Sequence, residues 1–163
     1  MKKRWMAVAL TAILLMAVGG AIGTVSVRQE SANVYDLYFV ERDLRAASGG
    51  DALRAEERVL SGGADSTAQQ AEALMAELLK GPVDQTLKSP FPKGTGLNSV
   101  EQKGTEIHVD FSAVYGTLSG MDLTLADYAV TMTLAQLPDV ARVRITVAGN
   151  NLDYRSRQVF LTR

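Results

Sequence analysis

Several stretches of the chain alternate between apolar and polar residues, the pattern of a β-strand with one buried face. The clearest are residues 34–40, 106–111 and 141–147. Residues 97–102 and 106–111 flank Lys103-Gly104, which suits a β-turn, so we predict a hairpin there. The side chains expected to face the core are Tyr35, Leu37, Phe39, Ile107, Val109, Phe111, Val143, Ile145 and Val147.

Two further stretches give weaker strand signals. Residues 53–60 alternate only partly, and their Ala, Glu and Arg also suit a helix, but we interpret them as a strand. Residues 158–162 are the candidate for a last short strand. Pro90, Pro92 and Gly94 predict an ordered loop instead of a strand.

A first helix is predicted where apolar residues recur every three or four positions. Thr67 and Gln70 form a capping-box pattern at its start, and Gly81-Pro82 ends it. Its predicted buried face consists of Ala71, Leu74, Met75, Leu78 and Leu79.

A second helix is predicted over residues 124–137, with Thr124 and Asp127 as candidate caps and Pro138 as its end. Its predicted buried face consists of Leu123, Ala126, Val130, Leu134 and Leu137. The order is β-β-α-β-β-α-β, followed by the candidate last strand. Because each helix has one apolar face, we predict an α/β (α+β) two-layer sandwich, with both helices on one face of a mixed sheet of about five strands.

The N-terminal residues indicate that the chain is directed to a membrane. Residues 6–27 form a run of 22 without a charge, preceded by Lys2, Lys3 and Arg4. As a helix of roughly 33 Å the run would cross a bilayer core, and the basic residues would keep the N-terminus in the cytoplasm. A signal peptide cleaved before Thr24 is the alternative, because Ala21-Ile22-Gly23 suits a cleavage site.

These features divide the chain into residues 1–28 as a signal anchor or signal peptide, 29–33 as a short tether, and 34–163 as a single domain. The predicted location is the cytoplasmic membrane, with one span, the N-terminus inside and the domain outside. Cleavage of the signal would instead give a secreted domain.

The charge and residue composition of the chain exclude several classes of function. From residue 29 onward 13 basic side chains face 18 acidic ones, a net charge of −5 with no basic patch, which argues against nucleic acid as a partner. The chain has no cysteine, so it has neither thiol catalysis nor thiolate metal sites. Its acidic residues and Gly-rich segments follow no calcium-loop or phosphate-loop spacing.

The single histidine raises the question of catalysis. His108, Asp110 and Ser112 are the residue types of a nucleophilic triad, and alternation places them on one face of a strand. Successive side chains on such a face are roughly 6.6 Å apart, however, whereas a triad needs direct hydrogen bonds. We therefore predict no catalytic residue, and we expect no cofactor and no metal.

Arginines are the candidates for a protein-interaction surface. Arg142 and Arg144 project from the polar face of the last clear strand, and Arg54 and Arg58 project from residues 53–60. Arginine is enriched at protein interfaces. Ordinary solubilising charge is the alternative for all four.

Three parts of the sequence, taken together, resemble the GerMN (Germane) domain over about residues 35–149. They are Tyr38-Phe39-Val40; Leu78-Leu79-Lys80-Gly81-Pro82; and Val109-Asp110-Phe111-Ser112 with Thr133-Leu134-Ala135-Gln136-Leu137 and the strand up to Gly149. The resemblance implies a two-layer α/β fold akin to ring-building modules of envelope-spanning complexes, a place outside the cytoplasmic membrane, and no known catalytic residue. Two features depart from the family: the chain has no cysteine for lipid attachment, and it holds one such domain where the namesake protein holds two.

These observations predict a non-catalytic interaction or assembly module, tethered to the membrane through residues 6–27. Its expected partners are other envelope proteins or further copies of itself, in a sporulation, germination or cell-envelope complex. The alternative is an extracytoplasmic domain that binds a cell-wall or small exported molecule. A large apolar cavity would favour the alternative, whereas an exposed edge strand would favour the interaction module.

Overall fold

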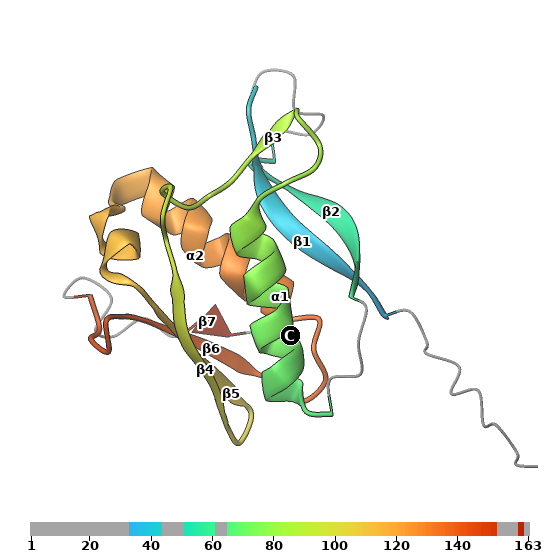
Figure 1. Ribbon diagram of the computed structural model, residues 1–163, viewed down its shortest axis with the longest axis vertical. Helices are drawn as coiled ribbons and strands as arrows, with labels where there is room; N and C mark the ends of the chain where they lie inside the picture. The colour runs from blue at the N-terminus through green and yellow to red at the C-terminus, as the bar shows by residue number, and fades with distance from the viewer. Residues whose placement is uncertain (1–32, 44–50, 61–64, 153–159, 162–163) are drawn as a thin grey trace, which may run out of the picture.

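The computed structural model describes residues 33–43, 51–60, 65–152 and 160–161 (Figure 1). The predicted anchor at residues 6–27 lies outside the described residues. Within the described parts, no helix is long and apolar enough to cross a membrane.

The strands of these described parts form two sheets. The first contains, in order, β2 (Leu53–Leu60), β1 (Asn33–Glu41) and β3 (Leu87–Lys88), all antiparallel. The second contains, in order, β4 (Leu97–Lys103), β5 (Glu106–Phe111), β6 (Arg142–Val147) and β7 (Phe160–Leu161), in which only β5 and β6 are parallel. The helices are α1 (Thr67–Lys80), the short 3₁₀ helix η1 (Ala113–Thr117) and α2 (Gly120–Leu134).

The predicted α/β class is confirmed, and each predicted strand and helix is present; β3 was not predicted. The strands divide between two sheets instead of forming one, because β3, Thr133 of α2 and Gln136 just after α2 share the second edge of β1. Gln136 accepts the N–H of Asp36 (2.8 Å) and donates to its carbonyl (2.6 Å), and the Thr133 hydroxyl accepts the N–H of Tyr38 (3.3 Å). A strand of the other sheet would need the same backbone groups.

The cap of helix α1 lies one residue before the predicted one. The cap is Ser66, whose hydroxyl accepts the N–H of Gln69 (3.3 Å), while the Gln69 side chain accepts the N–H of Asp65 (2.9 Å). The pair is shifted by one position from the predicted Thr67 and Gln70, and it differs from a capping box in that Gln69 bonds to the residue before the cap.

Helix α2 begins four residues before its predicted start. Thr124 therefore does not cap it but lies inside the first turns, where its hydroxyl donates to the carbonyl of Gly120 (3.1 Å). Asp127 lies deeper still and is buried. The helix ends three residues before the predicted end, because the N–H of Leu137 donates to the carbonyl of Leu134 (3.1 Å), a tighter turn than an α-helix makes.

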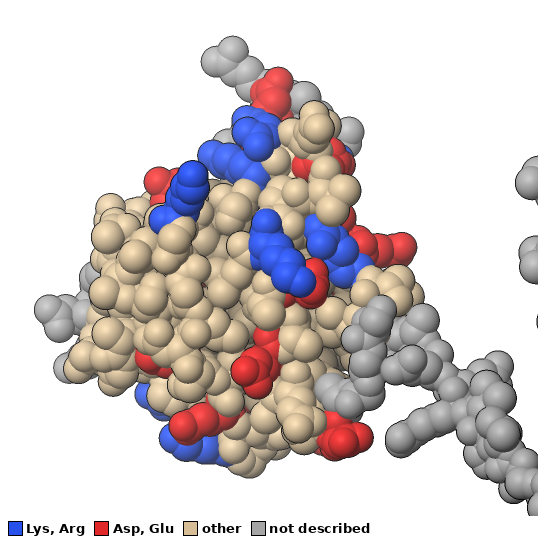
Figure 2. All heavy atoms as spheres, in the orientation of Figure 1, with Lys and Arg blue, Asp and Glu red and all other residues tan. Residues whose placement is uncertain are grey.

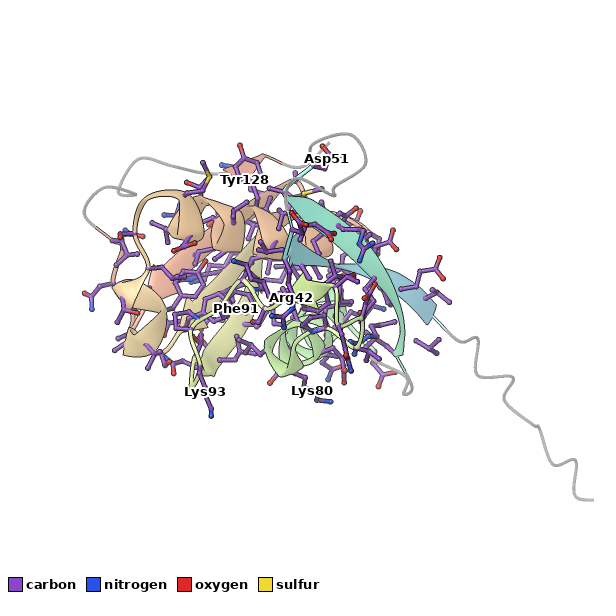
Figure 3. The ribbon with its side chains drawn as sticks, turned by 90° about the horizontal axis from the view of Figure 1, so that it is seen from above. Arg42, Asp51, Lys80, Phe91, Lys93 and Tyr128 are labelled. Atoms are coloured by element: carbon purple, nitrogen blue, oxygen red, sulfur yellow. The ribbon has the colours of Figure 1, made fainter. Side chains whose placement is uncertain are left out.

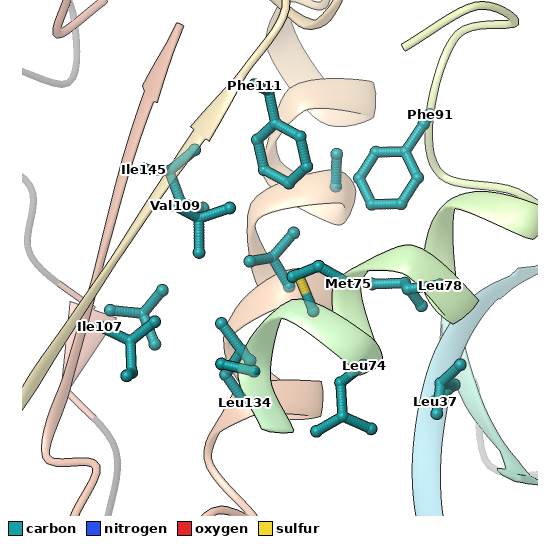
Figure 4. Packing of buried hydrophobic residues seen from close by; sticks show 14 of the residues in the cluster. Leu37, Leu74, Met75, Leu78, Phe91, Ile107, Val109, Phe111, Leu134 and Ile145 are labelled. Atoms are coloured by element: carbon teal, nitrogen blue, oxygen red, sulfur yellow. The ribbon is translucent and has the colours of Figure 1, made fainter. Parts of the chain in front are cut away.

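The core fills the space between the two sheets and the helices. In Figure 4, side chains of α1 lie between those of β5 on one side and Leu37 of β1 on the other. Phe91, Phe111 and Tyr115 pack as a cluster, with ring centroids 4.6–5.9 Å apart, and the Tyr115 hydroxyl donates to Asp127 (2.7 Å). Of the predicted core side chains, Tyr35 and Leu79 are only partly buried.

Candidate protein-interaction surfaces

The first pair of predicted interaction arginines lies on β2, on the face toward α1. Arg54 is opposite Phe39 and Arg58 is opposite Tyr35, and opposite residues of an antiparallel pair share a face. This is the buried face of β1. Figure 2 shows charged side chains gathered around β2 and the end of α1, next to a broad uncharged area.

Arg58 holds the turn that follows α1. Its guanidinium pairs with Glu56 (Nε···Oε1 2.7 Å), donates to the carbonyl of Gly81 (3.1 Å) and lies 3.7 Å from Glu77. Glu56 in turn accepts the N–H groups of Val83 (3.0 Å) and Asp84 (2.8 Å). Because the side chains of Arg58 and Glu56 are only 17% and 14% exposed, this cluster stabilises the fold more than it offers a surface.

Two carboxylates of this region, Glu56 and Asp84, have lowered pKa values. Burial raises the pKa of Glu56, but hydrogen bonds from the backbone of Asp84 and Val83 and from Arg58 lower that pKa further than burial raises it. Hydrogen bonds from Thr86 lower the pKa of Asp84. Arg54, about half exposed, reaches both Asp84 (2.8 Å) and Glu41 (3.2 Å).

The second pair of arginines lies on β6, in the other sheet, on the face opposite the core. Arg144 pairs with Glu106 of β5 (2.9 Å), and hydrogen bonding from Arg144 lowers the pKa of Glu106. Arg142 is exposed and forms no ion pair among the residues that the structure describes. The four arginines are therefore not one surface but two pairs on two sheets, and their role in binding stays a prediction.

His108 and Asp110 belong to a hydrogen-bond network that does not include Ser112. Asp110 accepts hydrogen bonds from Thr146 (2.6 Å), from Asn98 (2.8 Å) and from the backbone of Gly149 (2.8 Å). Burial raises the pKa of Asp110, and these hydrogen bonds together with His108 lower it by more.

Thr146 bridges the two side chains, since His108 Nε2 lies 3.0 Å from its hydroxyl oxygen. The one proton of that hydroxyl goes to Asp110, so Nε2 of His108 is the donor to Thr146. Ser112 lies apart, with its hydroxyl accepting the N–H of Gly96 (2.9 Å). Strand spacing alone did not indicate the bridge, which depends on the parallel register of β5 and β6.

The free edge of β2 is a surface that was not predicted from the sequence. In an antiparallel pair, opposite residues alternate between bonding each other and pointing their backbone groups away. Asp36 and Tyr38 bond to α2, on the side away from β2. Their opposite residues on β2, Glu57 and Ala55, therefore point their N–H and C=O groups outward from the sheet.

The same alternation applies at both ends of β2. The outward residues are Leu53, Ala55, Glu57 and Val59, and their backbone groups have no hydrogen-bond partner within the described ranges. Beside them Val34 and Val59, an opposed pair on the outer face, are 54% and 58% exposed. An edge strand of eight residues with free groups can accept another strand.

The family with the description "sporulation and spore germination", Germane, matches residues 36–153, most of the chain. The chain belongs to the Germane family. No curated protein matches the sequence.

Solved structures of Germane domains have the same fold. The first GerMN domain of the sporulation protein GerM from Bacillus subtilis is 24% identical, with a TM-score of 0.56 over 74% of this chain and 86% of that one. The tandem GerMN domains of the same protein are 20% identical, with a TM-score of 0.54 over 78% of this chain and 43% of that one. This chain thus spans less than half of the tandem.

The residues that resemble the Germane family have structural roles in this member. The Leu78–Pro82 stretch ends α1, where Gly81 has a φ of 88° that favours glycine and where its carbonyl bonds to Arg58. In the Thr133–Leu137 stretch, Thr133 and Gln136 occupy the edge of β1.

Two hollows border the loop that precedes β4. One, of about 190 Å³, lies between that loop and α2, and the other, of about 270 Å³, lies between the loop and Leu79. Both are smaller than typical small-molecule sites of roughly 300–1,000 Å³. Among the described residues, no cluster of three potential metal ligands is present.

Proposed function

We propose that this Germane domain is a non-catalytic module that binds other proteins outside the cytoplasmic membrane, held there by residues 6–27. The free edge of β2 is the observation that carries this proposal. Family membership supports a place in sporulation or spore germination. The basic residues before the uncharged run support the orientation.

The proposed mode of binding is addition of a strand beside β2. An extended segment of a partner would bond to the outward N–H and C=O groups of Leu53, Ala55, Glu57 and Val59. Charged residues on β2, among them Glu57, would limit indiscriminate pairing of the open edge. Recognition would therefore depend on backbone bonding together with charge complementarity at Glu57.

The alternative, binding of a small exported molecule, has less support. The two hollows, of about 190 and 270 Å³, are smaller than typical small-molecule sites. The non-catalytic interpretation is supported by the hydrogen bond that Ser112 accepts from Gly96, on a site separate from His108 and Asp110.

A proline substitution tests the proposed edge. Glu57→Pro removes one outward N–H, while the bonds between β1 and β2, made by the neighbouring residues, remain. We expect this variant, used as full-length bait from solubilised membranes, to lose proteins that the unaltered chain captures. Glu57→Ala is the matched control, because it removes the same side chain but keeps the N–H.

The two variants separate backbone pairing from charge. Capture that Glu57→Pro leaves unchanged, in a chain whose thermal melt is unaltered, would contradict strand addition at β2. Equal losses in both variants would assign the binding to the carboxylate instead.

A further inference from the structure

Helix α2 has a second apolar stripe, on its outer side. Its core-facing residues are buried as predicted, but Met121, Leu125, Tyr128 and Met132 lie on another face. Met121 is 70% exposed, Tyr128 49% and Met132 37%, and Leu125 is partly exposed. Figure 3 shows Tyr128 projecting from the side of α2 that faces away from the core.

The stripe has the spacing of a helix that pairs with another helix. Its residues follow one another at intervals of four, three and four positions, the repeat of a coiled-coil seam. Beside the seam Ala129 and Thr131 are buried, Thr124 is exposed and uncharged, and Asp122 is the exposed charged residue of the helix. Depletion of charge distinguishes the centre of a protein interface from other surface.

The direction of α2 is set by its contacts with β1. Gln136, just after the helix, bonds to Asp36 near the start of β1, and Asp122, near the start of the helix, lines the same hollow as Val40 near the end of β1. The two elements therefore run in opposite directions (Figure 1). Since β1 follows the proposed anchor in the chain, the C-terminal end of α2 is the end nearer to the membrane.

We propose that two copies of this chain pair through α2, with the helices parallel and in register. The proposal rests on the tethering in the proposed function. In a closed symmetric pair of copies anchored in one membrane with the same orientation, the two-fold axis lies along the membrane normal. Helices that extend along that axis are then parallel, and each residue of the stripe meets its own counterpart.

The size of the stripe explains why the membrane is part of the proposal. A stable interface typically buries about 800 Å² on each partner, whereas this seam offers four side chains on each helix. Anchors in one membrane raise the effective concentration of the two copies. Methionine, with its flexible side chain, is suited to a weak seam of this kind.

Engineered cysteines test the pairing directly, because the chain contains no cysteine of its own. Full-length chains with Leu125→Cys or Tyr128→Cys would be oxidised in isolated membranes, and we expect a disulfide-linked dimer from each single variant. The matched control is Val83→Cys, in the loop after α1, where the side chain is 75% exposed and should give no dimer above background.

Co-expression of two cysteine variants tests whether the paired helices are parallel or antiparallel. Co-expressed Met121→Cys and Met132→Cys chains should cross-link each to its own kind and not to each other. A predominant link between the two variants would show antiparallel helices and overturn the proposal. Equal cross-linking at Leu125 and Val83 would overturn it too.

Two further variants separate this proposal from the proposed function. Tyr128→Glu added to Leu125→Cys should abolish the dimer, because a carboxylate would be buried in the seam. Glu57→Pro added to Leu125→Cys should leave the dimer intact, since β2 is not in the seam. A chain that stays in the membrane without cross-linking contradicts the pairing alone, whereas a chain found only in the soluble fraction contradicts the tethering.

Discussion

At the scale of single residues, Arg58 and Glu56 connect three segments of the chain. They join β2 to the end of α1 and to the loop that follows it through charged hydrogen bonds that are mostly shielded from water. Such bonds contribute more than neutral or exposed ones, and loss of one partner leaves the other without compensation.

We therefore expect Arg58→Ala to lower the free energy of unfolding by about 1–3 kcal/mol, as loss of a buried partner does. Arg142→Ala is the control, because Arg142 is exposed and its loss should change stability by no more than about 0.5 kcal/mol. Urea unfolding of both variants measures the difference. Equal effects would mean that the Arg58 cluster is as dispensable as a surface charge.

The lowered pKa of Asp110 predicts that the stability of the domain depends on pH. Its pKa is lowered in the folded protein, so its contribution is present above the unfolded-state pKa of about 3.9 and disappears as the pH falls through the folded pKa. Asp110→Asn should therefore reduce stability at pH 7 and lose less stability than the unaltered chain on going to pH 3. Asp51→Asn, at an exposed position before β2, is the control and should change stability at pH 7 by no more than about 0.5 kcal/mol. An unchanged acid response in Asp110→Asn would contradict the assignment.

At the scale of elements, Thr133 of α2 and Gln136 just after it take the place of a strand beside β1. Gln136→Ala should expose the N–H of Asp36, so that its amide hydrogen exchanges faster, and should cost about 1 kcal/mol of stability. Gln102→Ala removes a comparable bond to a turn carbonyl at Gly104 and should leave the exchange at Asp36 unchanged. Equal protection of Asp36 in all three chains would show that water or another group satisfies this edge.

This substitution for a strand also explains what sequence could and could not predict. Alternation located β1, β5 and β6, and the apolar spacing located the buried faces of α1 and α2, because those patterns depend on neighbouring residues. The division into two sheets depends on Gln136 meeting Asp36, 100 positions apart. No local pattern contains that contact, and the free edge of β2 follows from the same contact.

The candidate sites differ from those predicted from the sequence for a similar reason. Arg54 and Arg58 were predicted to lie on a protein-interaction surface, but the register with Phe39 and Tyr35 places them on the face toward α1. The stripe from Met121 to Met132 is visible in the sequence, but the same helix has a second, more strongly apolar face, and only that face was predicted. Both corrections required knowing which side of an element meets the core.

At the scale of the whole molecule, both proposals depend on where the domain sits. Strand addition at β2 would give contact with other proteins, and pairing through α2 would give contact between copies, on separate elements. A module with two such surfaces could bind two kinds of partner at once. The pairing through α2 further requires that the chain be held at the membrane in one orientation.

The most direct test is the intact mass of the chain recovered from cells, combined with protease treatment from the outer side of the membrane. We predict an uncleaved chain in the membrane fraction, whose domain is accessible to protease only from outside. A mature chain that begins near Thr24 and is found in the soluble exported fraction would contradict the tethered module.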